Sequence, residues 1–308
     1  MIGLLLMEQI GVLFLMILLG WVLVRSGLLR SEDSRSLSVV TLYLASPCVM
    51  LNAFQIPRTP ELEKGLVLSL TAAALIHLVL FLLTAFFGKI ARLTAVEQAS
   101  VMYSNAGNLV IPVVGAVLGE EWVVFSTVFM VIQIPLLWIH CRALLSGERR
   151  VPVKKILCNP NILAVLAGVA LFLGEVSLPP MITVAMASVG GMLGPLSMVA
   201  AGMLIGGMDL KKVVSFRGVW KTAALRLLAA PLVLLLVLRF SGLAALAERG
   251  ETILLVSFLA TATPAAATVT QMAQLFRRDA EYASAIYVVT TLLCILTMPA
   301  LVALWQAG

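Results

Sequence analysis

Ten apolar stretches follow one another along the chain, separated by short segments rich in charged and turn-forming residues. Each stretch is close to the ~20 residues that a helix needs to cross the hydrocarbon core of a bilayer. This pattern predicts an all-α integral membrane protein with ten transmembrane helices. The predicted spans are residues 9–24, 36–54, 65–87, 95–118, 123–140, 159–173, 180–205, 220–240, 251–275 and 282–305.

The composition agrees with this pattern and leaves little chain for anything else. Hydrophobic residues make up 61% and charged residues 12% of the 308 residues, against roughly 45–50% and about 25% in soluble globular proteins. Ten spans take roughly 200 residues, which leaves about ten for each loop or tail. No room remains for a soluble catalytic or nucleic-acid-binding domain, so we expect no nucleic-acid partner.

The basic residues predict the orientation in the membrane. Sixteen of them fall in loops after odd-numbered spans, and only Arg58, Lys64, Arg239 and Arg249 fall in loops after even-numbered spans. Because cytoplasmic loops carry the excess of Lys and Arg, the odd loops are expected in the cytoplasm and both termini outside an inner or plasma membrane. All five tryptophans lie at predicted span ends, where an indole is favoured.

An internal repeat emerges when the two halves are compared at an offset of about 150 residues. The matched pairs are Gly20 with Gly168, Pro47 with Pro195, and Pro112 with Pro264. The repeat predicts two five-helix units, residues 1–146 and 158–308, joined by a basic cytoplasmic hinge loop at 147–157. Because each unit has an odd number of spans, the second enters from the opposite side, as in the inverted repeats of many secondary transporters.

The fourth span contains a polar interruption. Asn105, Gly107, Asn108 and Pro112 lie within eight residues at its middle. Pro112 has no N–H to donate to the carbonyl of Asn108, and Gly107 weakens the helix further. The sequence therefore predicts a helix break at Gly107 and Pro112.

The ninth span is interrupted at the matching place. Thr261 and Thr263 precede Pro264, which leaves the carbonyl of Ala260 without its helical donor. Paired interruptions in matching halves are the best sequence indication of a transport site. The alternative is a pair of ordinary proline kinks whose polar side chains bond neighbouring helices.

Several motifs resemble those of the auxin efflux carrier family, and the resemblance covers nearly the whole chain. They are N-x-G-N-x-x-x-P from Asn105 to Pro112, C-N-P-N from Cys158, G-P-L from Gly194, and Pro299. Two departures are Val110, where bacterial relatives often carry glycine, and the alanine-rich stretch after Pro264.

This resemblance implies a fold and a mechanism. It implies a 5+5 inverted repeat with broken, crossing helices 4 and 9, an architecture like that of sodium/proton antiporters and bile-acid transporters. It implies scaffold and transport parts drawn from both repeats, an elevator-like mechanism and a homodimer. The family's crossover asparagine falls on Asn105. The implied substrate is a small organic anion, such as an auxin-like indole acid or another mono- or dicarboxylate.

The acidic residues, Glu97 among them, all fall at predicted span edges or in loops. Without a carboxylate at mid-membrane, a proton antiporter built on buried acids is disfavoured. An anion held by amides and by the N-terminal ends of half-helices needs no carboxylate. Sodium coupling through neutral oxygens stays open.

Other polar residues inside the spans have two interpretations. Gln133, Thr290 and Thr291 lie near the middle of their spans, where they either face a cavity or bond a neighbouring helix. Arg226 lies about two turns into span eight. We favour an anchor that extends to the cytoplasmic interface, and the alternative is a charge that draws anions inward.

Together these features predict a secondary transporter of a small organic anion that needs no metal or cofactor. The expected substrate-binding residues are Asn105, Asn108, Thr261, Thr263 and Gln133, and the expected helix-break residues are Gly107, Pro112 and Pro264. A passive channel, or a sodium-coupled carrier of a non-anionic solute, is the alternative. An intramembrane enzyme is disfavoured, because the chain has two histidines and no Ser–His pair, buried aspartate pair or HExxH helix.

Overall fold

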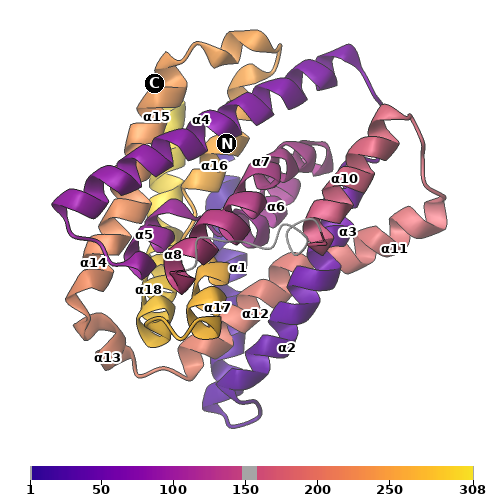
Figure 1. Ribbon diagram of the computed structural model, residues 1–308. Helices are drawn as coiled ribbons and strands as arrows, with labels where there is room; N and C mark the ends of the chain where they lie inside the picture. Colours follow the sequence, from indigo (N-terminus) through magenta and orange to yellow (C-terminus); the bar gives the residue numbers. More distant parts are fainter. Residues whose placement is uncertain (1, 148–157, 308) are drawn as a thin grey trace. The chain divides into compact units, whose positions relative to one another are not determined.

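The computed structural model describes residues 2–147 and 158–307 (Figure 1), so the predicted hinge loop lies outside the described residues except for Gly147. The described residues are helical, apart from turns and one isolated antiparallel bridge between Ser104 and Ala265. They divide into two compact units, Met1–Glu63, Gly107–Thr127 and Val153–Met208 in the first, and Lys64–Ala106, Val128–Pro152 and Asp209–Gly308 in the second. Each unit therefore draws segments from both halves of the sequence.

The first unit is held together by a close approach of two helices, α1 and α12. Its helices are α1 (Ile2–Arg25), α2 (Ser34–Val40), α3 (Ser46–Asn52), α6 (Ala106–Val117), α10 (Pro160–Leu173), α11 (Pro180–Gly190) and α12 (Leu193–Gly206). A Cβ at Gly202 would collide with the carbonyl of Ile17, and one at Gly20 with the carbonyl of Val199. Small residues thus let the α1 and α12 backbones touch, as is common between membrane helices.

The second unit contains the longest helices. It comprises α4 (Pro60–Ile90), α5 (Ala95–Met102), α8 (Arg142–Ser146), α13 (Leu210–Ser215), α14 (Arg217–Ala224), α15 (Ala230–Phe240), α16 (Gly250–Thr261), α17 (Ala267–Leu275) and α18 (Ala280–Ala307). Helix α7 (Val123–Leu136) begins in the first unit and ends in the second. Within the second unit, α5, α14 and α18 pack against one another (Figure 1).

The helices lie where the apolar stretches predict them, and their lengths differ from one stretch to the next. Among the described residues, six helical segments are long and apolar enough to cross a membrane: Ser31–Asn52, Pro60–Ile90, Glu120–Ser146, Pro180–Gly206, Arg217–Phe240 and Ala280–Ala307. Four shorter apolar helices are Gly11–Arg25, Ala106–Val117, Pro160–Leu173 and Gly250–Thr261. This is the architecture of a multi-pass membrane protein.

The predicted fourth and ninth spans are each two helices. Helices α5 and α6 are separated by residues 103–105, and α16 and α17 by residues 262–266. The prediction that Gly107 and Pro112 form the first break is wrong, because both residues lie inside α6. The chain leaves the helix earlier, at Tyr103, whose φ of −101° and ψ of 126° are extended. Pro264 does lie within the second break.

Local sequence sets where the half-helix α5 begins. Thr94 and Glu97 form a capping box, in which the Thr94 hydroxyl accepts from the Glu97 N–H and the Glu97 carboxylate accepts from the Thr94 N–H. This reciprocal pair satisfies two of the N–H groups that a helix start leaves without partners. The start of α5 is therefore set by its own residues.

Candidate functional site

The two breaks pair with each other in the second unit. The Asn105 N–H donates to the Pro264 carbonyl at 2.9 Å, and the Ala266 N–H donates to the Tyr103 carbonyl at 3.0 Å. These two bonds flank Ser104 and Ala265, which face each other as the antiparallel bridge. We call residues 103–105 and 262–266 the crossing. Unwound backbone buried in a membrane protein needs internal partners, and here each break supplies them to the other.

Gln133 of α7 forms hydrogen bonds with the main-chain N–H and carbonyl of Ser104, which the other break does not bond. Its Nε2 donates to the Ser104 carbonyl at 2.9 Å, and its Oε1 accepts from the Ser104 hydroxyl at 2.6 Å and from the Ser104 N–H at 3.4 Å. The Gln133 side chain is 1% exposed. Both ends of the amide are engaged with Ser104, so Gln133 contacts the crossing directly.

Helix α18 contacts the main chain of the other break, residues 262–266. The Thr290 hydroxyl accepts from the Ala265 N–H at 3.2 Å, and the Cys294 thiol contacts the Ala262 carbonyl at 3.5 Å. Thr291 bonds only the Tyr287 carbonyl of its own helix, at 2.7 Å. Of the two interpretations of the mid-span polar residues, bonding to a neighbouring element therefore applies to Gln133 and Thr290.

Pro264 frees the carbonyl of Ala260, as the sequence predicts, and the structure shows how it is satisfied. The Thr263 hydroxyl donates to the Ala260 carbonyl at 3.0 Å. The Thr261 hydroxyl likewise donates to the Phe258 carbonyl, at 2.7 Å. Both hydroxyls are thus used within the end of α16, and what Thr261 and Thr263 offer to other elements is their carbonyl oxygens.

Those carbonyls bind Arg226, which lies in a π-helical turn, Leu225–Ala229, between α14 and α15. Nε donates to the Thr263 carbonyl, Nη2 to the Thr261 carbonyl and Nη1 to the Val101 carbonyl, each at 3.0 Å. The residue is 0% exposed. The interpretation of Arg226 as an interfacial anchor is therefore wrong: the guanidinium points into the second unit and joins the ends of α5 and α16.

The predicted asparagines lie at the start of the next half-helix. Asn105 is buried, with 4% of its surface exposed, and immediately precedes α6. Asn108 is half-buried in the first turn of α6, which belongs to the first unit. The second unit thus brings together Asn105, Gln133, Thr261 and Thr263. The hydrogen bonds of the crossing described above involve no carboxylate.

A protein-family model described as membrane transport protein matches residues 5–302. The chain belongs to the auxin efflux carrier family. As a member of this family it is a secondary transporter in a membrane and not an enzyme. Comparison with curated protein sequences gives no match. In this carrier, no group of three His, Cys, Asp or Glu side chains among the described residues is arranged to hold a metal ion.

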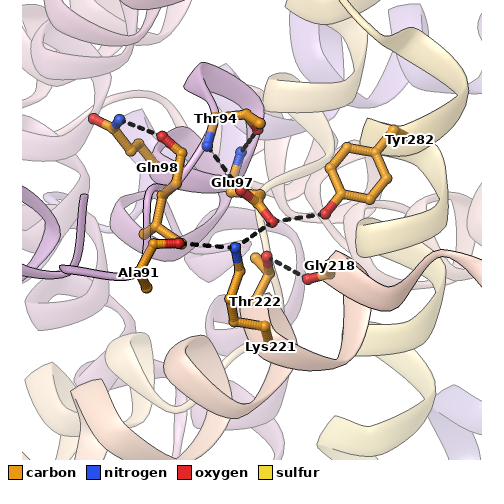
Figure 2. Close-up of polar contacts among 9 residues, drawn as sticks. Ala91, Thr94, Glu97, Gln98, Gly218, Lys221, Thr222 and Tyr282 are labelled. Atoms are coloured by element: carbon orange, nitrogen blue, oxygen red, sulfur yellow. Dashed lines mark hydrogen bonds and ion pairs between the residues drawn. The ribbon is translucent and has the colours of Figure 1, made fainter. Parts of the chain in front are cut away.

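The carrier has a second polar cluster that the sequence analysis missed, centred on Glu97 at the start of α5 (Figure 2). The Glu97 side chain is 3% exposed, and its Oε1 accepts from the Tyr282 hydroxyl at 2.8 Å and pairs with Lys221 Nζ at 3.1 Å. Lys221 also donates to the Ala91 carbonyl at 3.2 Å. Glu97 thus lies at the edge of its span, as expected, and the structure adds that it is a buried, ion-paired carboxylate.

This cluster fastens α5 to α14 and α18, and Gly218 makes room for it. A Cβ at Gly218 would collide with the Tyr282 hydroxyl and with Glu97 Oε1. The Thr94-x-x-Glu97 spacing, a capping-box pattern, was the sequence signal that could have located this carboxylate at a helix start. Its partners, Lys221 and Tyr282, come from distant segments and gave no such signal.

Proposed function

We propose that the carrier moves a small organic anion, an auxin-like acid or another mono- or dicarboxylate, by elevator-type alternating access. The observation that carries the proposal is the hydrogen-bonded crossing of the two breaks. Transporters with broken helices hold their substrates where half-helix ends meet near the midplane of the bilayer. Asn105 lies at such an end and is the first candidate to donate its amide to a carboxylate.

Charge supports an anion over a cation. Helices α6 and α17 both begin directly after the crossing, at Ala106 and Ala267. The N-terminal end of a helix carries a partial positive charge of about half an elementary charge. Arg226 adds a full positive charge, and its hydrogen bonds occupy three carbonyls at the ends of the other half-helices. The balance favours a negatively charged ligand.

The division of the chain supports a moving part and a fixed part. Both breaks belong to the second unit, whereas the closely packed pair α1 and α12 belongs to the first. We infer that the second unit is the transport part and the first the scaffold, within ten transmembrane helices arranged as a 5+5 inverted repeat. We also propose that both termini are extracytoplasmic, which cysteine labelling from either side of the membrane tests. We propose that the carrier is a homodimer, which measurement of its mass in detergent tests.

The experiment is counterflow of labelled carboxylates in proteoliposomes, across a panel of mono- and dicarboxylates. The key variant is Asn105→Ala, and Asn52→Ala in the first unit is the matched control. We expect saturable exchange in the unaltered carrier and in Asn52→Ala. In Asn105→Ala we expect exchange to be abolished, while expression and thermal stability change little.

Three results contradict the proposal. Exchange at the unaltered rate in correctly inserted Asn105→Ala removes the crossing as the substrate site. Non-saturable flux without counterflow indicates a passive channel. Sodium-driven uptake of a neutral solute, with no flux of any anion, indicates the sodium-coupled alternative.

A further inference from the structure

The guanidinium of Arg226 occupies an unusual position for a membrane arginine. It is fully buried, and its three nitrogens each bond a different main-chain carbonyl at 3.0 Å. No carboxylate of the described residues forms an ion pair with it. A charge buried in this way needs strong compensation, which here comes entirely from the backbone.

The three carbonyls belong to the two broken segments and no others. Val101 lies in the last turn of α5, Thr261 is the last residue of α16, and Thr263 lies in the break that follows. The C-terminal end of a helix carries partial negative charge on its unpaired carbonyls. Arg226 therefore neutralises the C-terminal ends of α5 and α16 at once.

Such a set of oxygens has a known use in transporters. Unwound carbonyls and half-helix C-termini are the groups that coordinate a coupling Na⁺ in carriers with broken helices. In this chain carbonyl oxygens of the same kind bind the guanidinium of Arg226, a cation that is part of the protein. A free alkali ion would have to displace three charge-assisted hydrogen bonds to bind there.

We propose that Arg226 is a built-in replacement for a coupling cation, so that the carrier cycles without Na⁺ or any other bound monovalent cation. The inference rests on the proposed function for its transport readout. The guanidinium cannot leave, so the ends of α5 and α16 stay neutralised whether the substrate site is loaded or empty. Arg226 is a positioning residue, because it acts through the two breaks.

The test removes the cation and offers a free one in its place. Arg226→Ala is compared with Arg239→Ala, a control at the exposed end of α15. Counterflow of a carboxylate from the panel above is measured in choline, in NaCl, and in choline with millimolar guanidinium chloride or urea. Urea has the shape of guanidinium without its charge, so it separates the effect of charge from the filling of a cavity.

We expect the unaltered carrier and Arg239→Ala to work equally well in choline and NaCl. In Arg226→Ala the rate in choline should fall by about tenfold or more, because three buried carbonyls lose their donor. Guanidinium should restore most of that rate, and urea should not. Thermal unfolding in detergent should show the same pattern, with guanidinium stabilising Arg226→Ala and leaving the unaltered carrier unchanged.

The thermal measurement keeps this inference separate from the proposed function. If no carboxylate is exchanged, the proposed substrate class is wrong, and guanidinium stabilisation of Arg226→Ala still decides the cation site. If Arg226→Ala does not fold, Arg226→Lys and Arg226→Gln replace it, and only the lysine variant should stay independent of added cations. A Na⁺ requirement in the unaltered carrier, or equal rescue by urea and guanidinium, overturns the inference.

Discussion

Gln133→Leu tests whether Gln133 supports the crossing or binds substrate. The change keeps the approximate size of the side chain and removes its three hydrogen bonds to Ser104. The N–H and carbonyl of Ser104 are then left without their buried partner, whereas the Ser104 hydroxyl is free to rotate and is not counted. Each such group costs about 1–3 kcal/mol, so the expected loss of stability is about 2–6 kcal/mol.

Two threonine variants in α18 provide a comparison for the expected loss of stability in Gln133→Leu. Thr290→Val removes the acceptor of one main-chain N–H, that of Ala265, and should cost about 1–3 kcal/mol, roughly half as much. Thr291→Val is the matched control, because its hydroxyl bonds only its own helix and the isosteric change should be nearly neutral. The order of stability should therefore be Thr291→Val, Thr290→Val, Gln133→Leu, from most to least stable.

The assays are thermal unfolding in detergent and counterflow kinetics in proteoliposomes. A positioning role predicts a lower unfolding temperature and a lower maximal rate for Gln133→Leu, with the half-saturating substrate concentration little changed. The reasoning is refuted if Gln133→Leu is as stable as Thr291→Val while its half-saturating concentration rises strongly. That result would support Gln133 as a substrate-binding residue.

Two further changes test the cluster around Glu97. Lys221→Met should destabilise the carrier by about 1–2 kcal/mol. Removing one partner of a fully buried ion pair costs ~3–5 kcal/mol. The cost is smaller here because Lys221 is partly exposed to water and Tyr282 still donates to Glu97. Adding Glu97→Gln to Lys221→Met should recover part of the loss in thermal unfolding, and no recovery would show that the ion pair is not the cause. Gly218→Ala should cost about 1–3 kcal/mol through the clash with the Tyr282 hydroxyl, whereas Gly88→Ala, which meets only ordinary contacts, should be neutral or slightly stabilising. Equal unfolding temperatures for the two alanine variants would contradict this packing.

The apolar pattern predicts the helices well, because the length of a span is set by the thickness of the bilayer and is visible in any sequence. It also predicts that two spans are interrupted. The predicted position of the first interruption, at Gly107 and Pro112, is wrong. A proline is tolerated inside a membrane helix when neighbouring groups bond the carbonyl that it frees. Gly194 packs closely against the Pro112 ring in the first unit.

Most hydrogen-bond partners of the breaks cannot be predicted from the sequence. The exception is local: Pro264 frees the Ala260 carbonyl, and the Thr263 hydroxyl, three residues away from Ala260, donates to it. Arg226 bonds carbonyls that are 35, 37 and 125 residues away along the chain, and Gln133 bonds one that is 29 residues away. Contacts of that kind depend on helix packing, which periodicity does not encode. A buried arginine and an interfacial one have the same sequence signature, and only the fold distinguishes them.

Arg226 belongs to the same unit as both breaks, so its charge goes wherever the substrate site goes. If that unit moves across the bilayer as proposed, the empty site carries a positive charge, and a site loaded with a monovalent anion carries none. A membrane potential of 100 mV changes the energy of one elementary charge by about 2.3 kcal/mol, which is a bias of about fiftyfold. The return of the empty site, rather than the passage of the substrate, would then be the step whose rate depends on the membrane potential.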